Sequence, residues 1–262
     1  MSEQPTIAEI RRVCQPPAVR GRRNSEHWVA DVYLRDISPY LTRLLLRTPI
    51  TANQVTWLMV LTGMGAAGAL LIPGLPGAMI AALLGQLQML WDCCDGEVAR
   101  WRGTTSPAGV FIDRVGHYTT EGLIPIALGL RAAGFPEAGW LTTPWPFLGA
   151  LLAVVILYNK SLNDMVHVSR AYNDLPRLAE SDEVSQPRRS GLRRLRGLVR
   201  FVPFHRAYHS VELTLLALVA AVIDVFLGDL GATQFLVAAL LGLGVITVIG
   251  HLIAILSSNR LR

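Results

Sequence analysis

Four side chains that can bind a metal ion or transfer a proton lie at helical spacing inside an otherwise apolar part of the sequence. Asp92 and Asp95 are three residues apart, and Asp113 and His117 are four residues apart, so each pair shares one face of a helix. A charged side chain costs roughly 2.5–3.5 kcal/mol at the centre of a membrane helix. Several such groups in consecutive apolar segments therefore predict a shared polar cavity with a function.

The two pairs flank a predicted turn. Ser106 is a typical helix N-cap residue, and Pro107 suits the first turn of a helix. We therefore expect the chain to reverse at residues 101–106 and to form a hairpin of two antiparallel helices. Asp95 and Asp113 are equally far from the centre of this turn, so they are predicted to lie at matching depth.

A cation would allow such a cluster to exist. Three carboxylates in a small, partly dry volume repel one another unless a positive charge lies among them. The oxygen-rich set favours one or two Mg²⁺ or Mn²⁺ ions over zinc, and Mg²⁺ often completes its shell with phosphate oxygens. The predicted metal ligands are Asp92, Asp95, Asp113 and His117.

Small residues and one arginine accompany the acids. Gly96, Ala99 and Gly109 leave room for a ligand between the two helices, although small residues also serve helix packing in membranes. Arg100, at the end of the first helix, is suited to hold phosphate oxygens.

Together these residues form a pattern with a fixed spacing, D92-x2-D95-G96-x2-A99-R100-x8-G109-x3-D113-x3-H117. The pattern resembles the signature of the CDP-alcohol phosphotransferase (CDP-alcohol phosphatidyltransferase) family, DxxDGxxARx8GxxxDxxxD. Seven of the eight fixed positions match. The segment ITANQVT at 50–56 is also similar to the TPNxxT often found in this family.

The resemblance implies a membrane transferase of phospholipid biosynthesis. Such an enzyme moves a phosphatidyl-type group from a CDP-alcohol, often CDP-diacylglycerol, to the hydroxyl of a small polyol or polyol phosphate and releases CMP. It also implies a homodimer, metal binding by Asp92, Asp95 and Asp113, and a CDP pocket lined by Gly96, Ala99, Arg100 and Gly109.

His117 stands where the family has a fourth aspartate, which is usually both a metal ligand and the base for the acceptor hydroxyl. An imidazole takes up a proton near neutral pH and can also bind a metal ion. Three interpretations stay open: base and ligand, base in a one-metal enzyme, or a silent site. Glu121, one turn further, could accept a hydrogen bond from His117 and fix its tautomer.

The composition indicates the membrane. Hydrophobic residues make up 52% of the chain and charged residues only 16%, and the mean hydropathy is +0.40, which excludes an ordinary soluble domain. The net charge of +5 comes from arginines in a few polar stretches, so a nucleic-acid partner is not expected. The three cysteines have neither zinc spacing nor an even number, so disulfides and structural zinc are not expected.

Apolar segments predict an all-α integral membrane protein with six transmembrane helices, at 53–72, 76–100, 107–131, 145–170, 209–228 and 232–257. Arginine gathers in alternate connectors, chiefly 1–50 and 171–208. By the positive-inside rule, both termini and the active site face the cytoplasm, as in a bacterial-type inner or plasma membrane.

The chain is predicted to have two parts. Residues 1–50 form a cytoplasmic segment whose stretch Tyr33–Arg47 is an amphipathic helix on the membrane surface; packing on a protein partner would give the same periodicity. Residues 51–262 form the transmembrane domain.

Polar residues near the end of the fourth predicted span are candidates for the acceptor site: Lys160, Asn163 and Arg170. Hydrogen bonding between helices would explain the asparagine equally well. His209 is interpreted as a packing residue because no other ligand-type residue lies at suitable spacing from it.

Two other functions stay possible on the sequence alone. A catalytically silent relative would bind the CDP-alcohol without turnover. A cation transporter would use the acidic cluster as its path, but it leaves the glycines and Arg100 of the pattern unexplained.

Overall fold

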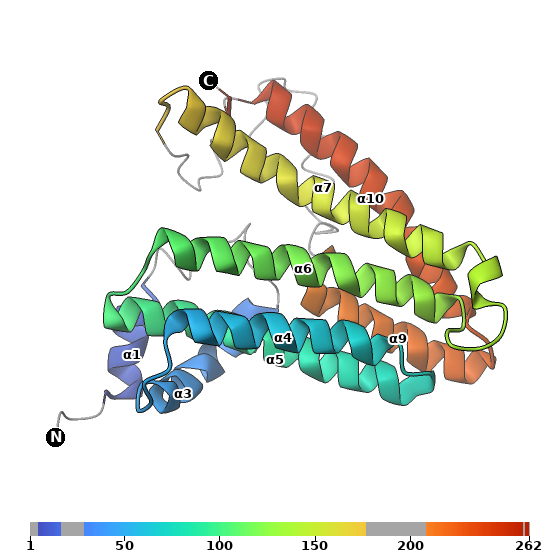
Figure 1. The fold of residues 1–262 in the computed structure, drawn as a ribbon, viewed down its shortest axis with the longest axis horizontal. Coiled ribbons are helices and arrows are strands. Elements are labelled where there is room, and N and C mark those ends of the chain that lie inside the picture. The colour runs from blue at the N-terminus through green and yellow to red at the C-terminus, as the bar shows by residue number, and fades with distance from the viewer. Residues whose placement is uncertain (1–4, 17–28, 177–207, 259, 262) are drawn as a thin grey trace.

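The computed structural model describes residues 5–16, 29–176, 208–258 and 260–261 (Figure 1). These residues form helices and no strands, which confirms the predicted all-α fold. The N-terminal elements are α1 (Ile7–Cys14), a π-helical segment η1 (Ala30–Leu34) and α3 (Arg35–Leu45). The longer elements are α4 (Ala52–Leu70), α5 (Gly74–Arg102), α6 (Pro107–Ala132), α7 (Trp145–Tyr172), α9 (Ser210–Leu227) and α10 (Gly231–Ser257), with a 3-10 turn η2 (Trp140–Thr142) before α7.

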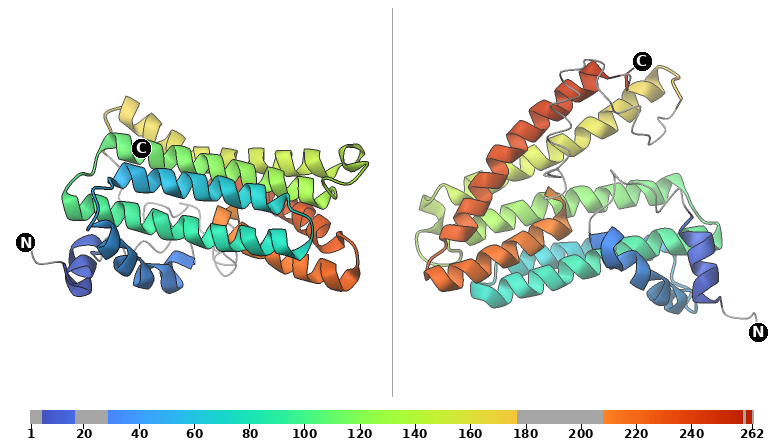
Figure 2. Two further views of the ribbon diagram at one scale, coloured as in Figure 1. Left: turned by 60° about the horizontal axis from the view of Figure 1, so that its bottom comes forward. Right: turned by 180° about the vertical axis from the view of Figure 1, so that it is seen from behind.

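The long helices pack side by side. α4 packs on α5 and α6, α5 packs on α9, and α6 packs on α7. α10 completes the bundle against α7 and α9. Figures 1 and 2 show that α7 and α10 lean away from α6 at the C-terminal end of α7.

Local signals in the sequence start and end the helices of the predicted hairpin. Gly103, with a φ of +65°, ends α5 in the left-handed conformation that glycine adopts easily. The Ser106 hydroxyl then accepts a hydrogen bond from Gly109 N at 3.1 Å and caps α6, with Pro107 in its first turn. The predicted reversal at 101–106 is confirmed, although α5 continues to Arg102.

α6 and α7 approach most closely through glycine at the end away from this turn. A Cβ atom on Gly129 would lie 2.6 Å from the Gly149 Cα, closer than Cβ contacts normally come. Nearer the hairpin turn, side chains of both helices interact instead, as described for the site below.

Four helices are long and apolar enough to cross a membrane: α5, α7, α9 and α10. Their outer faces expose large apolar side chains such as Phe226 at 84% and Phe235 at 74%, as expected for contact with lipid. Their length and apolar composition indicate an integral membrane protein.

The other two predicted spans are helical but less apolar. α4 has Asn53 and Gln54 in its first turn and is rich in glycine and alanine. α6 carries Asp113, Arg114 and Glu121. Composition therefore supports four spans, and six spans stay a prediction. The Arg-rich connector at 171–208 lies mostly outside the described residues.

The N-terminal helices lie against the C-terminal half of α5 (Figure 2). The stretch predicted as an amphipathic helix is helical, as part of η1 and α3, but its amphipathic character stays a prediction, because the side chains it directs inward include the polar Ser38 and Thr42, both fully buried. Ile37, Tyr40 and Leu44 are exposed. Their exposure fits a helix at a membrane surface, which stays a prediction. The division of the chain into residues 1–50 and 51–262 also stays a prediction.

Candidate functional site

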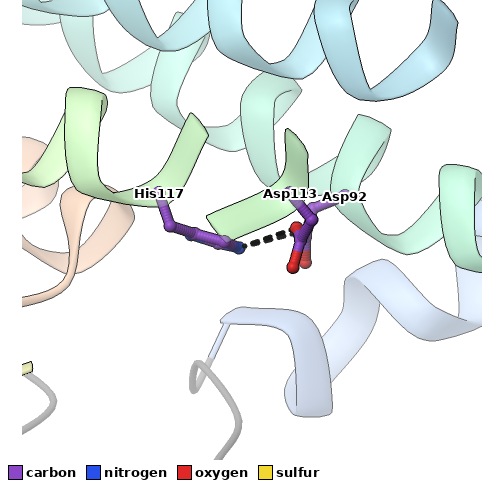
Figure 3. A group of neighbouring side chains, drawn as sticks. All are labelled: Asp92, Asp113 and His117. Atoms are coloured by element: carbon purple, nitrogen blue, oxygen red, sulfur yellow. Dashed lines mark hydrogen bonds and ion pairs between the residues drawn. The ribbon is translucent and has the colours of Figure 1, made fainter. Parts of the chain in front are cut away.

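The α5–α6 hairpin brings three of the four predicted ligand residues together. His117 Nε2 lies 3.0 Å from Asp92 Oδ1 and 3.4 Å from Asp113 Oδ1. One ligand atom from each of these residues lies within 4.8 Å of the others. Figure 3 shows the imidazole directed toward the two carboxylates. We call this group the Asp92–Asp113–His117 cluster.

The half-buried side chains of the cluster form a set that suits a divalent cation. Two carboxylates and one imidazole offer mainly oxygen ligands, which Mg²⁺ and Mn²⁺ prefer. The negative charge of the carboxylates would also attract such an ion. The donor set therefore fits the predicted metal ion.

Asp95, the fourth predicted ligand, has a different partner. Its Oδ2 accepts a hydrogen bond from Thr56 Oγ1 on α4 at 2.7 Å. Asp95 does not belong to the group of ligand atoms within 4.8 Å, so its role as a ligand stays a prediction. Thr56 is the last residue of the ITANQVT segment, whose similarity to the family is a signal that could have pointed to this contact.

The two faces of α5 differ sharply around the acids. The side that carries the pattern is half-buried and includes Asp92, Asp95, Gly96, Ala99 and Arg100. The opposite side is fully buried and consists of Cys93, Cys94, Glu97 and Val98. The residues predicted to touch a ligand therefore share the more accessible face.

The predicted donor-pocket glycines let polar groups approach the backbone. A Cβ atom on Gly96 would lie 2.9 Å from Arg100 Nη1, and one on Gly109 would lie 3.2 Å from Asn53 Oδ1. Arg100 Nε donates to the Cys14 carbonyl at 2.6 Å. The roles of Gly96, Ala99, Arg100 and Gly109 toward a nucleotide stay predictions.

A pocket of about 130 Å³ opens beside these residues at the turn end of the hairpin. Arg102, in its wall, donates to the Thr48 carbonyl at 2.8 Å and also to the Ile50 carbonyl. The pocket joins the start of α4 to the end of α5, and its lining residues are Thr51, Ala52, Asn53, Arg102 and Thr104.

A buried carboxylate lies next to the cluster. Glu121 is 2% exposed, and its Oε2 lies 2.7 Å from Lys160 Nζ on α7. Its Oε1 lies 3.3 Å from His209 Nδ1, at the start of α9, and 4.0 Å from His117 Nδ1. The Glu121–His117 distance is too long for a hydrogen bond, so the predicted bond is not formed. Glu121, on α6, nevertheless contacts side chains of α7 and of the start of α9 next to His117.

Sequence reasoning missed His209. It is 88 residues from Glu121 along the chain, and no local motif marks it. The fold alone brings it to the site, so its interpretation as a packing residue was incomplete.

A second ion pair continues along the contact between α6 and α7. Asp164 accepts a hydrogen bond from Tyr118 Oη at 2.9 Å and pairs with Arg114. Lys160 Nζ lies 5.6 Å from the centre of the Tyr118 ring. We call these five side chains the α6–α7 polar seam: Arg114, Tyr118, Glu121, Lys160 and Asp164.

The other two predicted acceptor residues contact other parts of the chain. Arg170 is buried and donates to the carbonyls of Pro176, at 2.8 and 3.0 Å, and Arg260, at 3.0 Å. Asn163 Oδ1 accepts from Arg260 Nη1 at 3.4 Å. Of the three candidates, Lys160 is the one that the structure ties to the cluster, through Glu121, and acceptor binding stays a prediction for all three.

Comparison with known proteins agrees with the pattern. Residues 49–172 match the family model described as CDP-alcohol phosphatidyltransferase, and this stretch contains α4, α5, α6 and α7 in full. The match confirms the resemblance predicted from the sequence. The family implies transfer of a phospho-alcohol group from a CDP-alcohol in phospholipid synthesis, with divalent metal ions. A search among curated proteins gives no match.

Proposed function

We propose that this protein, whose residues 49–172 match the CDP-alcohol phosphatidyltransferase family, transfers a phosphatidyl-type group from CDP-diacylglycerol or a similar CDP-alcohol to a small polyol or polyol phosphate. The observation that carries the proposal is the Asp92–Asp113–His117 cluster, which lies in the hairpin that bears the family pattern. A chance cluster would not explain the accompanying glycines and Arg100 at family spacing.

One or two divalent ions would bind to Asp92, Asp95, Asp113 and His117. When bound, such ions neutralise the charge of a diphosphate and of the departing CMP. Asp95 would take part from one turn nearer the end of α5, held by its hydrogen bond from Thr56.

His117 is proposed to take the proton of the acceptor hydroxyl. As the acceptor oxygen bonds to the phosphorus attached to the donated alcohol, the phosphorus–oxygen bond to CMP breaks and CMP leaves with that electron pair. Positioned bases contribute roughly a hundredfold to ten-thousandfold to such steps. Asp92 and Asp113, at 3.0 and 3.4 Å, orient the ring for this role.

The nucleotide part of the donor is proposed to lie near Arg100 and the pocket lined by Thr51, Asn53 and Arg102. The guanidinium of Arg100 suits phosphate oxygens. Because arginine-rich connectors flank this end of the hairpin, we place it on the cytoplasmic side, with α4 and α6 as the two remaining membrane spans.

The direct test is release of CMP. Purified protein in lipid nanodiscs would be incubated with CDP-diacylglycerol, Mg²⁺ or Mn²⁺ and a panel of polyols and polyol phosphates. We expect CMP only when donor, metal ion and a suitable acceptor are all present. Glu137→Gln, which changes an exposed carboxylate in the α6–α7 connection, serves as the control variant.

The same experiment separates the alternatives. A silent relative would be stabilised by the CDP-alcohol against heat but would release no CMP. A cation transporter would carry ions into vesicles without a nucleotide. The proposed homodimer is tested separately, by the mass of the protein in nanodiscs.

A further inference from the structure

Glu121 lies beside His117 and pairs with Lys160, one of the predicted acceptor residues. Its carboxylate is 2% exposed, and a buried carboxylate is costly unless opposite charges or hydrogen-bond donors compensate it. Lys160 Nζ, at 2.7 Å, and His209 Nδ1, at 3.3 Å, supply that compensation. Lys160 is therefore engaged by an internal anion.

This pairing changes what Lys160 offers a ligand. Its side chain is 21% exposed, so a ligand can reach it and use its remaining N–H donors. The neighbouring negative charge of Glu121, however, offsets the positive charge. The pair as a whole presents hydrogen-bond donors with no net charge.

The rest of the α6–α7 polar seam repeats this arrangement. Arg114 is paired with Asp164, which also accepts from the Tyr118 hydroxyl. Each described cation of the seam thus has a carboxylate partner. On the other side of His117, Asp92 and Asp113 carry the negative charge that the proposed metal ion would balance.

A phosphate monoester carries a charge of roughly −1.5 to −2 near neutral pH. Placed beside this seam it would meet Glu121 and Asp164 as well as their cations. The paired charges of the seam would not weaken the binding of an uncharged polyol, because its hydroxyls can donate to carboxylates and accept from Lys160, Arg114 or Tyr118.

We infer that Glu121 is a specificity-determining residue that makes the protein prefer an uncharged polyol to a polyol phosphate as acceptor. The inference rests on the proposed transferase function and narrows its acceptor class. It concerns the selection of the acceptor, and the bonds formed and broken are those given above.

The test compares each polyol with its own monophosphate. Glycerol with glycerol 3-phosphate, and inositol with inositol 1-phosphate, would be supplied with CDP-diacylglycerol and Mn²⁺, and kcat/KM measured from CMP release. For the unchanged protein we expect kcat/KM to be at least about tenfold higher for the free polyol than for its phosphate. Repulsion between the phosphate and one unit charge near a partly buried site would produce a difference of this size.

Substitutions of Glu121 and Lys160 test the effect of the Glu121 charge by itself. Glu121→Gln is expected to shift the ratio of the two kcat/KM values at least about tenfold toward the phosphate, whereas Glu121→Asp keeps the charge and should keep the preference. Glu121→Gln combined with Lys160→Gln makes the pair neutral again and should return the ratio toward that of the unchanged protein. This double variant also serves if Glu121→Gln alone does not fold. Glu137→Gln should leave the ratio unchanged.

Binding gives a second measurement. Glycerol 3-phosphate alone should raise the Tm of the Glu121→Gln protein more than that of the unchanged protein. If a general loss of packing were the only effect of the substitution, both acceptors would be affected alike and this difference would be absent.

The outcomes separate the inference from the function beneath it. Preference for the polyol phosphate in the unchanged protein, or a ratio that Glu121→Gln does not move, would overturn the inference and leave the transferase intact. No CMP release with any acceptor would overturn the proposed function and the inference with it.

Discussion

Glu97 on α5 and Glu121 on α6 are both buried, at 0% and 2% exposed, but they have different partners. Glu97 Oε1 accepts hydrogen bonds from Ser38 Oγ at 2.6 Å and Gln15 Nε2 at 2.7 Å, and its Oε2 accepts from Thr42 Oγ1 at 2.6 Å. These donors are uncharged, and they come from the N-terminal part of the chain.

Glu121 instead faces Lys160 and His209, which are partly exposed side chains that can carry charge. It lies beside His117 at the accessible side of the hairpin. The difference teaches what each carboxylate does. The uncharged donors that bond to Glu97 stabilise the packing of the N-terminal part of the chain on α5. The ionisable, partly exposed groups around Glu121 form part of a site.

Residues near Glu97 also contact the end of α5 that carries the family pattern. The Cys14 thiol donates to the Glu97 carbonyl at 3.3 Å, and the Cys14 carbonyl accepts from Arg100. Burial raises the pKa of Cys14 to about 11, so the thiol keeps its proton and remains a donor at neutral pH. The N-terminal helices are thus connected to the end of α5 that carries Arg100.

The largest effect is expected in the site region. Asp113→Asn removes a charge from the Asp92–Asp113–His117 cluster and should lower kcat/KM at least about a hundredfold, since groups that stabilise charge in the transition state are worth this much. CMP release and Tm should be measured together, because the fold should be kept. Asp174→Asn, at an exposed position, is the matched control. Near-normal activity in Asp113→Asn would remove the cluster from the reaction.

His117→Ala sharpens the role of the imidazole. We expect kcat to fall roughly a hundredfold or more, as for loss of a general base, while the KM for the donor changes less. Steady-state kinetics with varied CDP-diacylglycerol would separate the two. Weaker donor binding with unchanged kcat would identify His117 as a metal ligand and not as the base.

Glu97→Ala should act on stability instead. It leaves the hydroxyls of Ser38 and Thr42 without the acceptor they have in Glu97, and each unsatisfied buried group costs about 1–3 kcal/mol. We expect a lower Tm and earlier proteolysis near the N-terminus, with kcat per folded molecule little changed. Glu137→Ala controls for loss of an exposed glutamate. A normal Tm would show that the contrast between the two buried carboxylates is wrong.

The smallest effect is expected at the hairpin turn. Ser106→Ala removes the cap of α6 and should cost about 1 kcal/mol of stability, seen as a small decrease in Tm. The neighbouring exposed Thr105→Ala should have less effect. Equal effects from both would mean that the cap at 3.1 Å does not stabilise the helix start.

Much of the hairpin could be predicted because its signals are local. Ser106 and Pro107 mark the start of α6, and the turn between α5 and α6 predicts that the acids of the two helices meet. The structure brings Asp92, Asp113 and His117 within ligand distance, whereas Asp95, predicted at the depth of Asp113, lies outside that group. Apolar stretches likewise located the long helices of the described residues. The small and polar residues of α4 and α6, however, lower their hydropathy, so composition supports four spans and not six.

The missed contacts depend on distant parts of the chain. The Gln15–Glu97 and Glu121–His209 contacts are 82 and 88 residues apart in sequence, and helical periodicity on either member predicts neither partner. Such pairs become visible only when tertiary packing brings their helices together.

The most direct measurement is CMP release from CDP-diacylglycerol by metal-free protein before and after Mn²⁺ is added, with a polyol acceptor present. We predict no CMP before the addition, rapid release after it, and loss of that release in Asp113→Asn. Release that is equally fast without the ion, or unchanged in Asp113→Asn, would contradict a metal-dependent transferase built on the α5–α6 hairpin.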